Sequence, residues 1–159
     1  MAAPDHFYSI DTSALIHGWR RAYPPANFGQ VWTRLEELIA EGRLRASIEV
    51  INEIERKDDE LCAWCNEQDD FIVDIDDAVQ NVLAEIMGTF PKLVDTAKGK
   101  SGADPFVIAL AQSQDPRWTI VSQELGGTDD RPKIPYVCAQ NKLRCINLLD
   151  LIQEREWKF

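Results

Sequence analysis

Residues 7–11 read FYSID, a short aromatic and β-branched run that stops at an acidic side chain. A run of this kind, without charge until its last residue, is typical of a strand buried on both faces. Related runs recur as FIV (71–73), WTIVS (118–122) and LRCINL (143–148), and residues 43–46 offer a shorter one. We expect these segments to form the strands of one sheet.

The segments between these runs have the periodicity of amphipathic helices. In FGQVWTRLEELIAEG (28–42) the apolar side chains recur at spacings of three and four, and Gly42 marks the end. Ser47 is a suitable N-cap for a second helix, whose apolar face continues as far as Trp64.

Two acidic residues mark further helix starts. Asp76 is expected to cap a helix that stops at Gly88, and Asp104 to cap a helix over FVIALAQ with Pro105 in its first turn. Residues 126–135 (GGTDDRPKIP) are predicted to be a loop, and a short helix closes the chain. Because strands that alternate with helices form parallel sheets between helical layers, we predict an α/β protein, a three-layer α/β/α sandwich around a short parallel sheet.

The chain has 159 residues, 45% hydrophobic and 28% charged, which suits a single globular domain over residues 1–159. It has 17 basic and 27 acidic residues, and the formal charge of −10 argues against broad, non-specific nucleic-acid binding. No apolar run reaches the ~18 residues of a membrane helix, and the first residues lack the pattern of a secretory signal. We therefore expect a cytoplasmic protein that does not associate with membranes.

Four cysteines raise the question of a metal or redox site: Cys62, Cys65, Cys138 and Cys145. A zinc site prefers two tight pairs, or pairs completed by histidine, and the chain has only two histidines. A redox C-x-x-C opens a helix after a strand, whereas Cys62 lies well inside an acidic helical stretch. Reduced structural thiols are the favoured interpretation, and a metal site and redox catalysis remain as alternatives.

Four acidic residues lie where a parallel sheet can collect functional side chains. Asp11 ends the first predicted strand and Glu124 follows the strand at 118–122, and such sheets bind ligands at the carboxyl ends of their strands. Glu53 and Asp104 lie on helices that could face the same edge. If the four carboxylates meet, their repulsion makes them take up protons or bind a cation, and hard oxygen ligands favour Mg²⁺ or Mn²⁺. A cation there would activate water for hydrolysis of a phosphodiester.

The chain resembles a PIN domain in four segments that follow the family's order and spacing: IDTSALI (10–16), S-x-x-V-x-x-E-I (47–54), ADPFVIALA (103–111) and IVSQE (120–124). The match spans almost the whole chain, and within the PIN family the chain resembles the VapC-like ribonuclease toxins. HGWRRAYPP and KIPYVC also resemble an uncharacterised prokaryotic PIN subfamily. The resemblance implies a PIN-like sandwich, a Mg²⁺-dependent ribonuclease, homodimerisation and, for toxin members, a small neutralising antitoxin protein.

The resemblance also assigns roles to the four acids. Asp11 matches the first metal-site acid, Glu53 the acid carried by a helix, and Asp104 the third acid. Glu124 falls where the family more often has aspartate, so its longer side chain favours a contact with the metal through water. All four are therefore expected to be catalytic and metal-binding residues.

The segment HGWRRAYPP supplies what single-stranded RNA needs, which is planar rings for stacking and guanidinium groups for phosphate. In the alternative interpretation, Trp19 packs at the end of a helix that the prolines stop. Lysines before ADPFVIALA either form a positive rim around the acids or are ordinary surface residues. The expected substrate-binding residues are Ser13, Trp19, Arg20, Arg21, Lys100 and Ser122.

The predicted function is therefore a Mg²⁺-dependent endoribonuclease that cleaves RNA through a metal-activated water, as the toxin of a toxin-antitoxin pair. The alternative is a PIN-shaped RNA-binding or regulatory module without catalysis, which the glutamate at position 124 and the acidic composition favour. A structure-specific DNA nuclease of related fold is a second rival, but those enzymes usually carry larger basic insertions.

Overall fold

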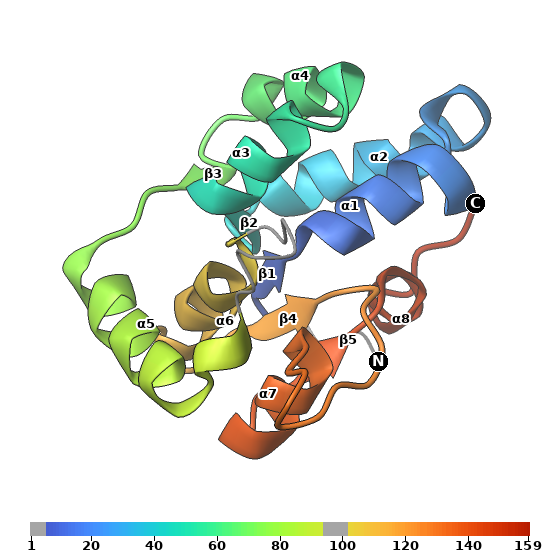
Figure 1. Cartoon of the computed structure of the whole chain (residues 1–159). Helices are drawn as coiled ribbons and strands as arrows, with labels where there is room; N and C mark the ends of the chain where they lie inside the picture. Colours follow the sequence, from blue (N-terminus) through green and yellow to red (C-terminus); the bar gives the residue numbers. More distant parts are fainter. Residues whose placement is uncertain (1–5, 94–101) are drawn as a thin grey trace.

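The computed structural model describes residues 6–93 and 102–159, and its centre is a parallel sheet (Figure 1). The strand order is β3-β2-β1-β4-β5, and every neighbouring pair is parallel. The strands are β1 (Tyr8–Ile10), β2 (Leu44–Ser47), β3 (Ile72–Val73), β4 (Thr119–Val121) and β5 (Cys145–Ile146). Each lies within or overlaps one of the predicted segments, and β5 is much shorter than the predicted run 143–148.

Helices cover both faces of this sheet, which confirms the predicted α/β/α sandwich. In Figure 1, α1 to α4 lie on one side of the strands, and α5 to α7 lie on the other. The helical elements are α1 (Thr12–His17), the π-helix η1 (Gly18–Ala22), α2 (Pro25–Ala40), α3 (Ile48–Glu55), α4 (Asp59–Glu67), α5 (Asp77–Thr89), the 3₁₀ turn η2 (Pro91–Leu93), α6 (Asp104–Gln112), α7 (Ile134–Asn141) and α8 (Leu148–Glu154).

The helix predicted to run from Ser47 to Trp64 is in fact two helices. Ser47 caps α3 as expected, because its side chain accepts a hydrogen bond from the Glu49 amide. The chain then leaves the helical path, and the Asp58 carboxylate accepts a 3.1 Å hydrogen bond from the Leu61 amide. The prediction was wrong here because an apolar face that continues across a break hides the second N-cap.

Helix α7 is missing from the sequence-based prediction. It begins at Ile134, inside the segment predicted as a loop, and ends before Lys142, whose φ of 58° is left-handed. Residues 126–135 contain two glycines and two prolines, which favoured a loop. However, a proline in the first turn of a helix loses no hydrogen bond that the helix needs, so Pro135 is compatible with this start.

The core holds the first strand at its centre, since Tyr8 and Ile10 are fully buried. Helix α6 packs against β1, and the Ser9 hydroxyl donates a 3.0 Å hydrogen bond to the Val107 carbonyl. A second packing unit lies under η1, where the ring of Trp19 meets that of Trp32 at 4.8 Å and Trp32 meets Trp64 at 4.9 Å. These contacts fix α2, α4 and η1 to one another.

The four cysteines are free thiols. Cys62 and Cys65 lie on α4, Cys138 lies on α7 and Cys145 on β5. Among the described residues, no helix has the length and apolar character that a membrane crossing requires.

Candidate metal centre

Asp11 lies directly after β1, at the carboxyl edge of the sheet. Its amide donates a 2.8 Å hydrogen bond to the Val121 carbonyl at the end of β4, and the residue is only 2% exposed. Because β1 and β4 are parallel neighbours with Ile10 paired to Val121, residues that follow either strand meet at this edge.

Two serines hold the Asp11 carboxylate. Ser13 donates a 2.6 Å hydrogen bond to Asp11 Oδ2, and Ser122 donates to the same oxygen at 3.0 Å. The hydroxyl of Ser13 in turn accepts from the Gln123 amide at 2.9 Å. The two predicted substrate-binding serines therefore lie at the base of the site, where they orient Asp11.

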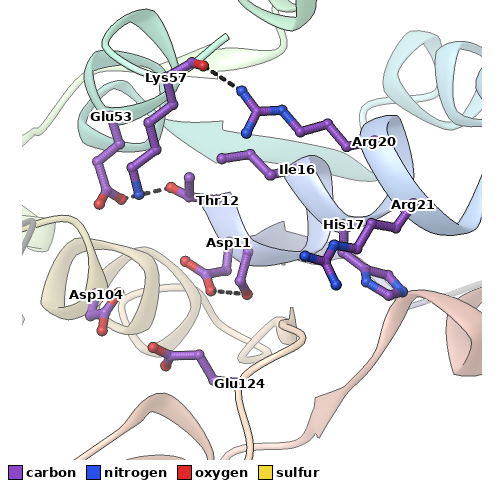
Figure 2. A pocket seen from close by; sticks show the side chains of 11 residues that line it. Asp11, Thr12, Ile16, His17, Arg20, Arg21, Glu53, Lys57, Asp104 and Glu124 are labelled. Atoms are coloured by element: carbon purple, nitrogen blue, oxygen red, sulfur yellow. Dashed lines mark hydrogen bonds between the residues drawn. The ribbon is translucent and has the colours of Figure 1, made fainter. Parts of the chain in front are cut away.

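Asp104 enters from the opposite helical layer, as the first residue of α6. The prediction that it caps this helix was wrong: Ala103 is the N-cap, and no side-chain capping bond forms. With no capping role, the carboxylate points toward Asp11 and Glu124 (Figure 2). The packing of α6 on β1 carries it there.

Glu124 follows β4 and turns its side chain toward the same point. Its amide donates a 3.1 Å hydrogen bond to Ser122 Oγ, which fixes the backbone. Its carboxylate accepts a 3.1 Å hydrogen bond from the amide of Ile134, the first residue of α7. The helix that the sequence failed to reveal therefore helps to hold one of the predicted acids.

Asp11, Asp104 and Glu124 together offer one carboxylate oxygen each, all within 4.8 Å of one another. Burial raises the pKa of Asp104 to about 9, and the neighbouring carboxylates of Asp11 and Glu124 add to this shift. Burial also raises the pKa of Asp11 to about 6, although the hydrogen bonds from Ser13 and Ser122 act in the opposite direction. Carboxylates this close repel, and a divalent cation with a preference for oxygen ligands would remove the repulsion. The donor set fits Mg²⁺ or Mn²⁺.

Glu53 lines the same cavity but does not belong to this group of three. The Thr12 hydroxyl donates a 2.7 Å hydrogen bond to Glu53 Oε1, and the side chain is buried. Burial raises the pKa of Glu53, while the bond from Thr12 and the charges of Lys57 and Arg56 oppose the rise. Glu53 is thus placed beside the cluster, on the wall formed by α3.

The cavity has a volume of about 460 Å³, and both acidic and basic side chains line it. Figure 2 shows His17, Arg20 and Arg21 on α1 and η1, and Lys57, which follows α3, beside Glu53. Arg20 is held in place, since its Nε donates a 2.8 Å hydrogen bond to Asp58 and its guanidinium also donates to the Lys57 carbonyl.

One of the predicted substrate-binding residues is placed differently, and the placement of another is not described. Trp19 does not line the cavity, because its ring packs on Trp32 and Trp64. This placement matches the alternative interpretation of Trp19 as a packed residue. Lys100 lies outside the described residues.

Among the described residues, four that line the cavity were absent from the predicted site: Thr12, Ile16, His17 and Lys57. Thr12 contacts Glu53 from 41 positions away, and no local pattern indicates such a pair. Lys57 follows Glu53 by four positions, a spacing that places two residues on one helix face, and this signal was available. His17 belongs to the segment already chosen for RNA contact.

Comparisons with known proteins give a family match and structural neighbours. The family described as "Domain of unknown function (DUF4411)" matches residues 8–159, whereas no curated protein matches the sequence. One neighbour is VapBC2 from Rickettsia felis, whose structure was solved with a bound DNA fragment from the promoter. The structural alignment has a TM-score of 0.53 at 15% sequence identity, and it covers 89% of this chain and 98% of the VapBC2 chain. FitAcB from Neisseria gonorrhoeae has a TM-score of 0.51 at 16% identity, covering 89% and 97%. These neighbours are PIN-domain toxins, and they confirm the PIN-like fold.

Proposed function

Because the chain belongs to the DUF4411 family, whose function is unknown, and has the fold of PIN-domain toxins, we propose that it is a metal-dependent endoribonuclease that hydrolyses RNA phosphodiester bonds. One observation carries this proposal. The carboxylates of Asp11, Asp104 and Glu124 converge in a cavity that Arg20, Arg21 and Lys57 also line. A site of that kind can hold a divalent cation and a phosphate group side by side.

The acids would hold Mg²⁺, with Mn²⁺ as a substitute. Such an ion supplies a water of lowered pKa and stabilises charge on the phosphate oxygens. The role of the protein is to orient the carboxylates. Ser13 and Ser122 hold the Asp11 carboxylate, and the Ile134 amide holds the Glu124 carboxylate. Glu53, beside the cluster, would accept a hydrogen bond from a water molecule or complete the acid set.

The basic side chains that line the cavity would bind the phosphate backbone of the substrate. Arg20, Arg21, His17 and Lys57 line the cavity, although the whole chain carries a formal charge of −10. A local cluster of this kind is what an acidic protein needs in order to admit a polyanion. Both arginines are exposed, but Arg20 is restrained by Asp58 and the Lys57 carbonyl, so Arg21 would have more freedom to meet a phosphate.

The same fold supports a proposal about the biological role. We propose that this nuclease acts in the cytoplasm as the toxin of a toxin-antitoxin pair, forms a homodimer and is neutralised by a small antitoxin protein. The structural neighbours VapBC2 and FitAcB support this role through the fold alone. Co-expression with the product of an adjacent small gene, followed by a growth assay, tests it.

An RNA cleavage assay tests the activity. Purified protein should cleave RNA with Mg²⁺ or Mn²⁺ and not with EDTA, and Asp11→Asn should lower the rate by at least about 100-fold. The matched control is Asp77→Asn, which alters an exposed acid in the first turn of α5 and should change the rate less than about 2-fold. Calorimetric titration with Mn²⁺ separates the rival: a PIN-shaped module without catalysis predicts no divalent binding that depends on Asp11.

A further inference from the structure

Glu124 faces two parts of the protein at once. One of its carboxylate oxygens lies within 4.8 Å of those of Asp11 and Asp104, and the same carboxylate accepts a 3.1 Å hydrogen bond from the amide of Ile134. Ile134 is the first residue of α7, and an amide at a helix N-terminus attracts a carboxylate. The place of Glu124 in the acid cluster therefore depends on where α7 begins.

The loop that leaves Glu124 packs closely against the start of α7. Gly127 lies in this loop with a φ of 111°. A Cβ atom added at Gly127 would lie 2.8 Å from the backbone nitrogen of Lys133 and 2.8 Å from the Cβ of Tyr136. Because carbon atoms in contact normally lie about 3.5–4.0 Å apart, no side chain fits between this loop and the first turn of α7.

The neighbouring Gly126 provides the contrast. It also has a positive φ, 71°, but a Cβ atom added there would meet nothing within 4 Å. The two glycines therefore share the left-handed backbone, which disfavours any L side chain. Only Gly127 is in close contact with α7.

We propose that Gly127 is a positioning residue for Glu124. Its lack of a side chain lets the loop pack directly on α7, and this packing places the Ile134 amide so that Glu124 reaches both the amide and the acid cluster. An aspartate at position 124 would be one methylene shorter and would lose one of the two contacts. The significance of the cluster rests on the proposed function, whereas the contact between Glu124 and Ile134 does not.

The experiment compares Gly127→Ala with Gly126→Ala in the full chain. Two readouts are needed: the affinity for Mn²⁺, from the electron paramagnetic resonance signal of the free ion, and the hydrogen exchange rate of the Ile134 amide, from NMR of ¹⁵N-labelled protein without metal. Gly127→Ala should weaken Mn²⁺ binding by about 10-fold, the scale for loss of a group that orients a metal ligand, and should speed exchange at Ile134. Gly126→Ala should change either value by less than about 2-fold.

The outcomes separate this inference from the proposed function. If wild-type protein binds no Mn²⁺, the proposed function loses its metal, and exchange at Ile134 alone decides the role of Gly127. If Gly127→Ala and Gly126→Ala bind Mn²⁺ with equal affinity and the Ile134 amide exchanges at the same rate in both, the positioning role is overturned. If Gly127→Ala does not fold, Glu124→Asp takes its place: faster exchange at Ile134 or weaker Mn²⁺ binding supports the double contact, and no change in either overturns it.

Discussion

The hydroxyl of Thr12 donates a 2.7 Å hydrogen bond to the carboxylate of Glu53, a residue 41 positions later in the chain. Thr12 opens α1 directly after Asp11, and Glu53 lies on α3, so this bond joins the two helices at the edge of the cavity. It orients a buried acid that lies beside the cluster of Asp11, Asp104 and Glu124 without belonging to it.

Thr12→Val should therefore impair catalysis through Glu53. Valine has nearly the same shape but cannot donate, and a hydrogen bond to a charged group contributes about 1.5–3 kcal/mol. We expect kcat/KM for RNA cleavage to fall by roughly 10-fold. Thr12→Ser keeps the hydroxyl and serves as the control. Equal activity of the valine and serine variants would show that Glu53 needs no such orientation.

The metal-free protein should lose stability as the pH rises. The folded-state pKa of Asp104 is raised to about 9 from an ordinary value of 3.8, mainly by burial. Between these values the folded state binds more protons than the unfolded state, so stability falls with increasing pH. Asp104→Asn removes this penalty. In EDTA at pH 8, thermal unfolding should show the variant to be more stable than wild type by roughly 1–3 kcal/mol. This range is reduced because the Asp104 side chain is partly exposed to solvent. The difference should vanish near pH 4, and a variant less stable than wild type at pH 8 would contradict the prediction.

Glu154 should have the opposite pH dependence. Burial by itself would raise its pKa, but hydrogen bonds from Arg144, Tyr8 and His6 lower it to about 2. A carboxyl group of this kind stabilises the folded state at pH values above 4.5, the pKa that it has in the unfolded state. This contribution is lost as the pH falls through about 2. Glu154→Gln should therefore cost about 1 kcal/mol at pH 7 and less at pH 3, as measured by thermal unfolding.

The control for Glu154 is Glu37→Gln. Glu37 forms an exposed ion pair with Arg34, three positions away on α2, and such pairs contribute little. Glu37→Gln should therefore change the free energy of unfolding only slightly at both pH 7 and pH 3. A loss that is the same at pH 7 and pH 3 for Glu154→Gln would show that its contacts act through packing instead of charge.

Cysteine reactivity should follow the environment of each thiol. The hydrogen bond from Cys138 lowers the pKa of Cys145, and the same contact raises the pKa of Cys138. Burial raises the pKa of Cys65 to about 12. Because the thiolate is the reactive form, iodoacetamide at neutral pH should label Cys145 at least about 10-fold faster than Cys65 or Cys138. Peptide mass spectrometry over time measures this, and in urea the three rates should converge.

Much of the fold could be predicted because its elements are local. The buried runs that became β1 and β4 contain almost no charge, and the residues of α2 repeat with helical spacing. The errors arose where a local pattern continued across a tertiary boundary. The apolar face of α3 carries on into α4 although Asp58 starts a new helix, and the glycines and prolines of 126–135 conceal the start of α7.

The candidate site was predictable only in part. Asp11 and Glu124 follow strands of a parallel sheet, so the sequence alone directs both to one edge. Asp104 and Glu53 lie on helices from opposite sides of that sheet, and their distance to the edge depends on how α6 and α3 pack. Packing brings Asp104 into the cluster, leaves Glu53 beside it and turns Trp19 away into the aromatic core.

The amino-acid sequence by itself determined which segments are buried strands and amphipathic helices, and which acids end up near the carboxyl edge of the sheet. Side-chain periodicity and capping residues act within a few positions, so this information can be read along the chain. Only the tertiary structure decided which three acids meet, that Ile134 holds Glu124, and that Arg20 is restrained by Asp58. Those contacts join residues up to about 110 positions apart, and they form only when the helices pack against the sheet and against one another.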